Sequence, residues 1–231
     1  MSRTALIVAH GQPSDPAPPE AEMAALAARV GALLPGWEVR SATLADPDAL
    51  SRALAGVERP VVFPFFMSDG WFIRTLLPRR LAEAGAEGAP ILTPFGLLPE
   101  AAELAVTLLK EATAGLGWSE AATTLVLAAH GSGASRRPAE TAGQLRDAIA
   151  QGTSFPEIRL GFIEEPPHLE EVLTGAPPRS LLLPLFVARW GHVEGDIPEA
   201  VEATGFQGQV LPPLGTARGV DEIIARAIAA G

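Results

Sequence analysis

The stretch that decides the fold is TALIVAHG at residues 4–11, because it returns as TLVLAAHG at residues 124–131. Each copy is a short apolar run that ends in a His-Gly pair, as a buried parallel strand followed by a turn does. At the same offset of 120 positions, VVFPFF at residues 61–66 returns as LLLPLF at residues 181–186. The sequence therefore predicts an internally duplicated chain.

Each repeat alternates predicted strands with amphipathic helices. In the first repeat, Met23, Leu26, Val30 and Leu33 share one face of a helix that begins at the Pro18-Pro19 pair. After the His-Gly strand, further strands are expected at residues 38–42 and 158–163, in the runs that end at Pro64 and Pro184, and at residues 89–93 and 209–211.

Strands that alternate with helices indicate right-handed crossovers and a parallel sheet covered on both faces. We therefore predict an α/β fold of two similar lobes, residues 1–117 and 118–231, each a four-stranded parallel sheet flanked by helices. A cleft is expected between the lobes, with the His-Gly turns at the carboxyl ends of the strands, where ligands gather in such sheets.

The composition excludes several classes of function. The 231 residues carry 17 basic and 27 acidic side chains, a net charge of −10 that argues against binding to nucleic acid or an anionic membrane. The absence of cysteine excludes disulfides and thiolate metal sites. The one lysine, Lys110, is followed by Glu111, so no Walker A nucleotide loop is present. No apolar run approaches the roughly 20 residues of a membrane span, and we expect a cytoplasmic protein.

Three side chains of the second repeat form a candidate metal site. His130, Glu164 and His192 each follow a predicted strand, and parallel strands end at the same edge of a sheet. Two imidazoles and a carboxylate suit Fe²⁺, Co²⁺, Ni²⁺ or Zn²⁺. A single histidine here is more often a hydrogen-bonded loop residue, but three convergent residues favour a metal site.

The first repeat has lost most of this set. At the offset of 120, Leu44 stands opposite Glu164 and Phe72 opposite His192, which leaves only His10. The metal site is therefore expected in the second repeat alone.

Aromatic residues of the first repeat are candidates for binding a planar ligand. Trp71 and Phe72 follow a glycine in a predicted turn and are expected to be exposed, with a flat apolar surface. For Phe65 and Phe66 we prefer interior packing.

Arginines gather at the same predicted edge. Arg136 and Arg137 follow the second His-Gly pair and Arg189 precedes His192, which suits an anionic substrate that offers carboxylates. Arg74, Arg79 and Arg80 follow the Pro-Phe turn of the first repeat, and for Arg79 and Arg80 solvated charge at a helix start is an equally good explanation. His168 follows Pro166-Pro167, is expected in the first turn of a helix, and is assigned no role.

The motifs of the second repeat together resemble a known family. They are the His-Gly strand end, FIE at 162–164, PLF at 184–186, GHV at 191–193, DIP at 196–198 and PPLG at 212–215. This set is similar to that of the sirohydrochlorin chelatases of CbiX type, which are related to the ferrochelatases. The resemblance implies two similar α/β lobes around a cleft, and a metal site of His130, Glu164 and His192.

The resemblance also implies an activity: insertion of a divalent metal without ATP into sirohydrochlorin or a related tetrapyrrole, for cobalamin or siroheme synthesis. Co²⁺ is expected first, with Fe²⁺ and Ni²⁺ as alternatives. An imidazole, with an ordinary pKa of about 6.5, can hold the ion or accept a pyrrole proton, and which residue does which stays open. Arg136, Arg137 and Arg189 would meet the macrocycle carboxylates, and Trp71, Phe72 and His10 would form the opposing wall.

Three other functions compete with this one. A non-catalytic carrier of metal or tetrapyrrole with the same fold stays possible, because the first repeat has lost two site residues. A histidine phosphatase is rejected, since Ala9 and Ala129 stand where its phosphate-binding arginine would precede the histidine. A nucleotide-binding α/β domain lacks its Gly-rich fingerprint. Nothing in the sequence indicates an oligomeric state.

Overall fold

The computed structural model describes residues 3–231, which form two compact units. The first unit contains the described residues up to Phe95 together with Arg218–Gly231, and the second contains Gly96–Ala217. Both units have the predicted α/β architecture, a parallel sheet with helices packed against it.

The first unit is built on a parallel sheet in the order β2-β1-β3. Ala9 pairs with Thr43 and Val8 with Pro64, so the three strands end at one edge. The elements of this unit are β1 (Arg3–Ala9), α1 (Ala17–Ala32), β2 (Trp37–Thr43), α2 (Ala49–Ala53), β3 (Pro60–Pro64), the π-helical turn η1 (Phe72–Leu76), α3 (Leu77–Glu83) and α8 (Val220–Ala230).

The second unit is built on a parallel sheet in the order β5-β4-β6-β7. Ala129 pairs with Phe162 and Ala128 with Pro184, so these strands also end together. Its elements are α4 (Pro99–Gly115), β4 (Thr124–Ala129), α5 (Arg137–Gly152), β5 (Glu157–Phe162), α6 (Leu169–Leu173), β6 (Ser180–Pro184), α7 (Asp196–Thr204) and β7 (Gln209–Val210), with 3₁₀ turns η2 (Phe95–Leu97) at its start and η3 (Glu120–Ala122), η4 (Gly191–Val193) and η5 (Leu214–Thr216) within it.

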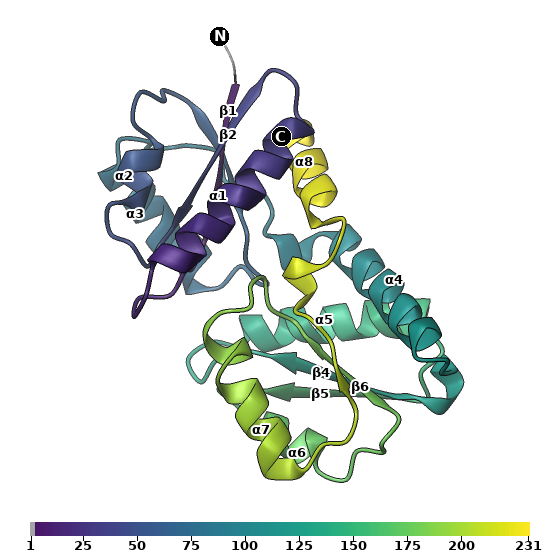
Figure 1. The fold of residues 1–231 in the computed structure, drawn as a ribbon. Helices are drawn as coiled ribbons and strands as arrows, with labels where there is room; N and C mark the ends of the chain where they lie inside the picture. The colour runs from purple at the N-terminus through teal and green to yellow at the C-terminus, as the bar shows by residue number, and fades with distance from the viewer. Residues whose placement is uncertain (1–2) are drawn as a thin grey trace. The chain divides into compact units, whose positions relative to one another are not determined.

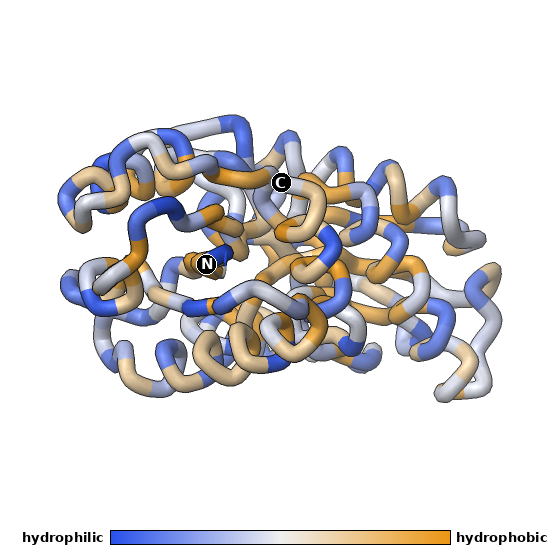
Figure 2. Tube along the Cα trace, turned by 90° about the horizontal axis from the view of Figure 1, so that it is seen from above, coloured by the Kyte–Doolittle hydropathy of each residue, from blue (hydrophilic) through white to orange (hydrophobic). Residues whose placement is uncertain are grey.

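Beyond their first one or two residues, the central strands are apolar because helices cover both faces of each sheet. Every residue of β4 and of β6 is buried, as the continuous apolar runs predict. In Figure 2 hydrophobic residues are drawn in orange and hydrophilic residues in blue, and orange predominates toward the middle of the view. Among residues 3–231, no helix combines the length and the apolar character that crossing a bilayer requires.

The first helix confirms the predicted apolar face with one exception. Met23, Leu26 and Val30 are buried, as their spacing predicts. Leu33 is 46% exposed, so its predicted burial is wrong, and Leu34 is buried instead. The reason is that α1 ends at Ala32: beyond that residue the helical spacing no longer decides which side chain faces the core.

The prediction of four strands in each sheet is wrong for the first unit. Within the described chain, the segment expected at residues 89–93 contributes one isolated bridge, between Val62 and Ile91. Val62 donates a hydrogen bond to the carbonyl of Pro90 and accepts one from Leu92. Pro90 has no N–H to donate, and Pro94 follows closely, so the pairing does not extend into a strand.

The compact units differ from the two sequence repeats in their last helices. Helix α4 closes the first repeat in sequence but packs against α5 of the second unit, and α8 closes the second repeat but packs against α1 and β3 of the first unit. Figure 1 shows α8, in yellow, lying along α1, in purple. Each unit is therefore completed by the terminal helix of the other repeat.

Candidate metal centre

His130 is the first residue after β4, and a glycine turn fixes its ring. Its Nδ1 lies 2.9 Å from the carbonyl oxygen of Gly131. Because a carbonyl only accepts hydrogen bonds, Nδ1 carries the proton and the lone pair of the neutral ring is at Nε2. Gly131 has a φ of +72°, and a Cβ there would lie 2.9 Å from Glu165 Cγ and 3.0 Å from Phe162 Cβ, so the turn requires glycine.

Glu164 is held beside His130 by backbone hydrogen bonds that continue past the strand ends. The N–H of Ile163 donates to the carbonyl of Ala129 at 3.1 Å, and the N–H of Glu164 donates to the carbonyl of His130 at 2.9 Å. One residue further, Glu165 turns back, and its Oε1 accepts the N–H of Ser132 at 2.7 Å. The two carboxylates thus have different environments: Glu165 ties down the turn, and Glu164 extends toward the histidine.

His192 comes from the 3₁₀ turn η4, which follows β6. Its ring meets that of His130 edge to face, with centroids 4.6 Å apart and planes at 87°. Its Nδ1 lies 2.8 Å from Oδ2 of Asp196, the first residue of α7. The ring of Phe186 lies behind it, with centroids 6.3 Å apart.

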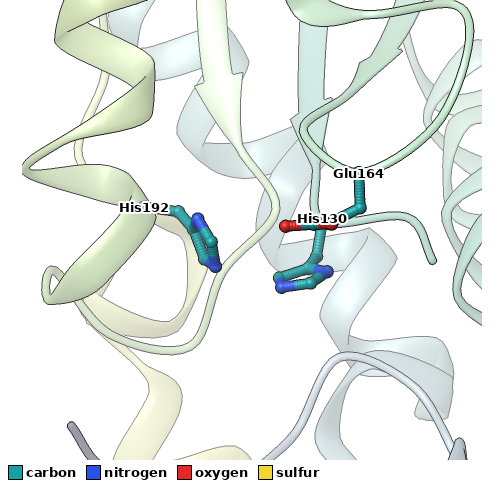
Figure 3. A group of neighbouring side chains, drawn as sticks. All are labelled: His130, Glu164 and His192. Atoms are coloured by element: carbon teal, nitrogen blue, oxygen red, sulfur yellow. The ribbon is translucent and has the colours of Figure 1, made fainter. Parts of the chain in front are cut away.

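The structure brings these three predicted side chains together. One ligand atom from each of His130, Glu164 and His192 lies within 4.8 Å of the other two. Figure 3 shows the three side chains pointing toward one another from separate segments of the chain. His130 and Glu164 are exposed and His192 is half-buried, so an ion held here remains accessible to a second ligand. Two imidazoles and a carboxylate fit a borderline divalent ion.

The first unit has the same framework but keeps only one of the three ligand residues, His10. His10 Nδ1 lies 2.9 Å from the carbonyl of Gly11, and the His10 ring meets that of Phe72 edge to face at 4.4 Å. Phe72 therefore occupies the place of His192, as predicted.

The predicted counterpart of Glu164 is wrong. The N–H of Ala45, not of Leu44, donates to the carbonyl of His10. Ala45 thus corresponds to Glu164, and the offset in this strand is 119 because the path from His10 to β2 is one residue longer than the path from His130 to β5. Leu44 is buried in the core of the first unit.

The predicted aromatic surface is partly exposed. Trp71 is 55% exposed, and its ring contacts that of Phe72 at 5.3 Å. Phe72 and Phe66 are half-buried and pack against the core. Phe65 is fully buried, which confirms the interior packing predicted for it.

The arginines named in the sequence analysis lie in both units. Arg136, Arg137 and Arg189 are exposed in the second unit, around the start of α5 and in the loop after β6. Those of the first unit pair with local carboxylates: Arg74 with Asp69, and Arg79 and Arg80 with Glu83. For Arg79 and Arg80, an exposed pair with Glu83 within α3 fits a role as helix-surface charges.

His168 has a structural place, and two carboxylates were missed. His168 is the N-cap of α6, and its N–H donates to the Glu171 carboxylate at 2.9 Å. Glu165 and Asp196 are not among the predicted site residues: Glu165 accepts the N–H of Ser132, and Asp196 contacts the His192 ring. An exposed acid in the first turn of a helix is common, so only its spacing of four residues from His192 could have singled out Asp196.

Comparison with known proteins places these features in a family. The family model described as CbiX matches residues 124–230. A structure of CbiX, the terminal enzyme for biosynthesis of siroheme in denitrifying bacteria, is 47% identical, with 99% of each chain covered and a TM-score of 0.93. A search of curated proteins finds no match.

Two structures of SirB share the fold at lower identity. SirB from Bacillus subtilis with Fe³⁺ is 15% identical over 99% of this chain and 95% of its own, with a TM-score of 0.77. The sirohydrochlorin chelatase SirB from Bacillus subtilis subspecies spizizenii, in complex with cobalt, is also 15% identical, over 99% and 94%, with a TM-score of 0.74. With near-complete coverage at 47% identity to one solved member, the chain belongs to the CbiX family.

Proposed function

We propose that this protein is a chelatase that inserts a divalent metal ion into sirohydrochlorin or a related tetrapyrrole without ATP. The observation that carries the proposal is the convergence of His130, Glu164 and His192 within 4.8 Å at the carboxyl edge of one sheet. Membership of a family whose 47% identical relative makes siroheme supports the same substrate.

The reaction exchanges one ion for two protons. M²⁺ leaves its protein and water ligands for four ring nitrogens, and the two pyrrole N–H protons leave the macrocycle. His130 and His192 offer one Nε2 lone pair each, and Glu164 offers a carboxylate oxygen. These groups hold the ion before transfer, and once the ion has left, the same lone pairs accept the protons. The exposure of His130 and Glu164 keeps the ion within reach of a flat ring.

The proposed metal is either Co²⁺, which the sequence favours first, or Fe²⁺. Siroheme is an iron tetrapyrrole, so similarity to an enzyme of siroheme biosynthesis gives Fe²⁺ equal weight with Co²⁺. The donor set accepts both ions and Ni²⁺, and the choice among them follows geometry and supply more than ligand type.

Substrate recognition is proposed for residues of both units. Arg136, Arg137 and Arg189 are exposed guanidinium groups suited to the carboxylates of the macrocycle. In the first unit, the exposed Trp71 with Phe72 and His10 offers an aromatic surface suited to a planar ring.

The experiment that tests the proposal is an anaerobic assay with sirohydrochlorin in large excess over protein, without nucleotide, with Co²⁺, Fe²⁺ and Ni²⁺ in turn. The chelatase converts many equivalents, and His192→Ala and Glu164→Gln each slow it by about 100-fold or more. His168→Asn is the matched control: it alters a histidine of the same unit but keeps a favoured N-cap, and its rate stays at the wild-type value.

The same assay separates the alternative function. A carrier binds sirohydrochlorin or metal one to one and stops, whereas a chelatase continues to turn over. Stoichiometric binding without turnover for all three metals would replace the proposed activity with the carrier function. Equal rates for His192→Ala and wild type would place the reaction away from this cluster.

A further inference from the structure

One ring nitrogen of His192 has a carboxylate partner outside the three metal-site residues. Nδ1 of His192 lies 2.8 Å from Oδ2 of Asp196. An ionised carboxylate accepts and does not donate, so Nδ1 carries the proton and the lone pair of the neutral ring is at Nε2. His130 has the same tautomer, because its Nδ1 faces the carbonyl of Gly131 at 2.9 Å. Both imidazoles therefore offer Nε2 as a ligand atom at the candidate metal site.

Asp196 is placed by a well-anchored turn. The N–H groups of Glu194 and Gly195 both donate to the carbonyl of Gly191 at 3.0 Å, which closes the turn that carries His192. Asp196 begins α7, and its neighbour Ile197 is buried in the core of the second unit. The carboxylate itself remains 48% exposed. Its backbone position is thus fixed by packing of the helix, while its side chain remains about half exposed.

The first unit supplies an internal comparison. At the offset that equates Phe72 with His192, Leu76 stands in the place of Asp196, while Leu77 matches the buried Ile197 and Pro78 matches Pro198. The packing residues are kept between the units. The imidazole and its carboxylate partner are both replaced by apolar side chains, Phe72 and Leu76. This happens in the unit that lacks two of the three metal-site residues.

The competing explanation for Asp196 is that its negative charge only stabilises the N-terminus of α7. Glu199 lies in the same first turn of α7 and is exposed, so it provides a carboxylate with that helix-end role alone. The joint loss of histidine and aspartate in the first unit favours a coupled role.

We propose that Asp196 is a positioning residue: it holds the His192 ring in the Nδ1–H tautomer, with Nε2 directed at the divalent ion. The inference rests on the proposed function and names a residue on which the metal site depends. Carboxylates that orient ligating histidines in this way typically account for 10- to 100-fold in metal affinity or activity.

The test uses Asp196→Ala, Asp196→Asn and Glu199→Ala in the full-length protein. Calorimetry measures Co²⁺ binding, and long-range proton–nitrogen correlation spectra of ¹⁵N-histidine protein report the His192 tautomer at about pH 8, above the ordinary imidazole pKa of about 6.5. His192→Gln identifies the resonance.

We expect Asp196→Ala to raise the Co²⁺ Kd by about 10- to 100-fold and to shift the His192 ring toward Nε2–H. Asp196→Asn replaces a pure acceptor by an amide that can donate to Nδ1 as well as accept from it, so it no longer enforces the Nδ1–H tautomer and should also lose affinity. Glu199→Ala removes a charge from the same helix turn and should leave both quantities unchanged.

Two kinds of failure are distinguishable. Asp196→Ala with the wild-type Kd and tautomer would overturn the positioning role, as would an equal loss in Glu199→Ala. If Asp196→Ala proves too unstable to study, Asp196→Asn carries the test, because a ring that stays fully Nδ1–H with the wild-type Kd in that variant contradicts the proposed lock. Absence of turnover by the wild type would instead count against the proposed chelatase, and the tautomer measurement on metal-free protein does not depend on it.

Discussion

The ring of Phe72 meets the ring of His10 edge to face, with centroids 4.4 Å apart and planes at 79°. This is nearly the geometry of His192 against His130, at 4.6 Å and 87°. The first unit thus keeps the framework of a metal site with only one of the three ligand residues.

Rebuilding the ligands should create a second metal site. In a chain carrying Ala45→Glu and Phe72→His, we expect two Co²⁺ ions bound per chain in place of one, because His10 already has its Nδ1 fixed by the Gly11 carbonyl. Adding Leu76→Asp should tighten the new site. Calorimetric stoichiometry measures the effect, and in a His130→Ala background any strong binding comes from the new site.

The matched control moves the carboxylate by one residue. Leu44→Glu with Phe72→His should bind no second ion, because Leu44 is 8% exposed and faces the core. It should also lower the free energy of unfolding. A second ion in the Leu44 variant but not in the Ala45 variant would contradict the register described here.

The turn after β4 should tolerate no side chain at Gly131. At a φ of +72°, Gly131→Ala incurs the cost of a left-handed backbone, about 1–2 kcal/mol, and its Cβ would lie 2.9 Å from Glu165. We expect a loss of at least that size in urea unfolding, together with weaker Co²⁺ binding. Gly133→Ala is the control: the nearest atom to its Cβ is 3.9 Å away, so its stability should change little. Equal losses in the two variants would refute this account of the turn.

Trp71 should contribute to tetrapyrrole binding and not to metal binding. Its ring is 55% exposed, and an aromatic contact is typically worth about 0.5–1.5 kcal/mol, so Trp71→Ala should raise the KM for sirohydrochlorin by about 2- to 10-fold. The Co²⁺ Kd should not change. Leu33→Ala removes another exposed apolar side chain of the same unit and should alter neither value. An unchanged KM in Trp71→Ala would exclude this surface from the substrate site.

Acid should weaken the first unit through Asp46. A hydrogen bond from the Arg52 guanidinium, with a further one from the Asp48 N–H, lowers the pKa of Asp46 below its ordinary value. A lowered pKa contributes stability above the unfolded-state value of about 3.9 that is lost as the pH falls through the folded-state value. Arg52→Met should therefore be less stable than wild type near neutral pH, and the difference should be smaller near pH 3 in urea titrations. The same difference at both pH values would assign the effect to lost packing.

The sequence predicts the metal cluster well because its three members follow strands, and the ends of parallel strands meet at one edge. The prediction that Leu44 is the counterpart of Glu164 is wrong because the first repeat has one extra residue between His10 and the paired part of β2. The sequence around Leu44 does not reveal this insertion. Asp196 was missed because an exposed acid at a helix start has many structural explanations.

The sequence pattern also does not predict which sheet the last helix of each repeat packs against. Helices α4 and α8 each carry an apolar face that predicts burial, but the pattern does not state against which sheet. The prolines at 90 and 94, in contrast, were visible in the sequence and are sufficient to explain why the expected fourth strand of the first unit is reduced to one bridge.

The central claim is that one divalent ion binds jointly to two imidazoles and one carboxylate of the second unit. Anomalous diffraction from crystals soaked with Co²⁺ tests it most directly. We predict one strong cobalt peak within about 2.0–2.2 Å of Nε2 of His130, Nε2 of His192 and a carboxylate oxygen of Glu164. A peak that contacts only one of these residues, or that lies at His10, would contradict the account.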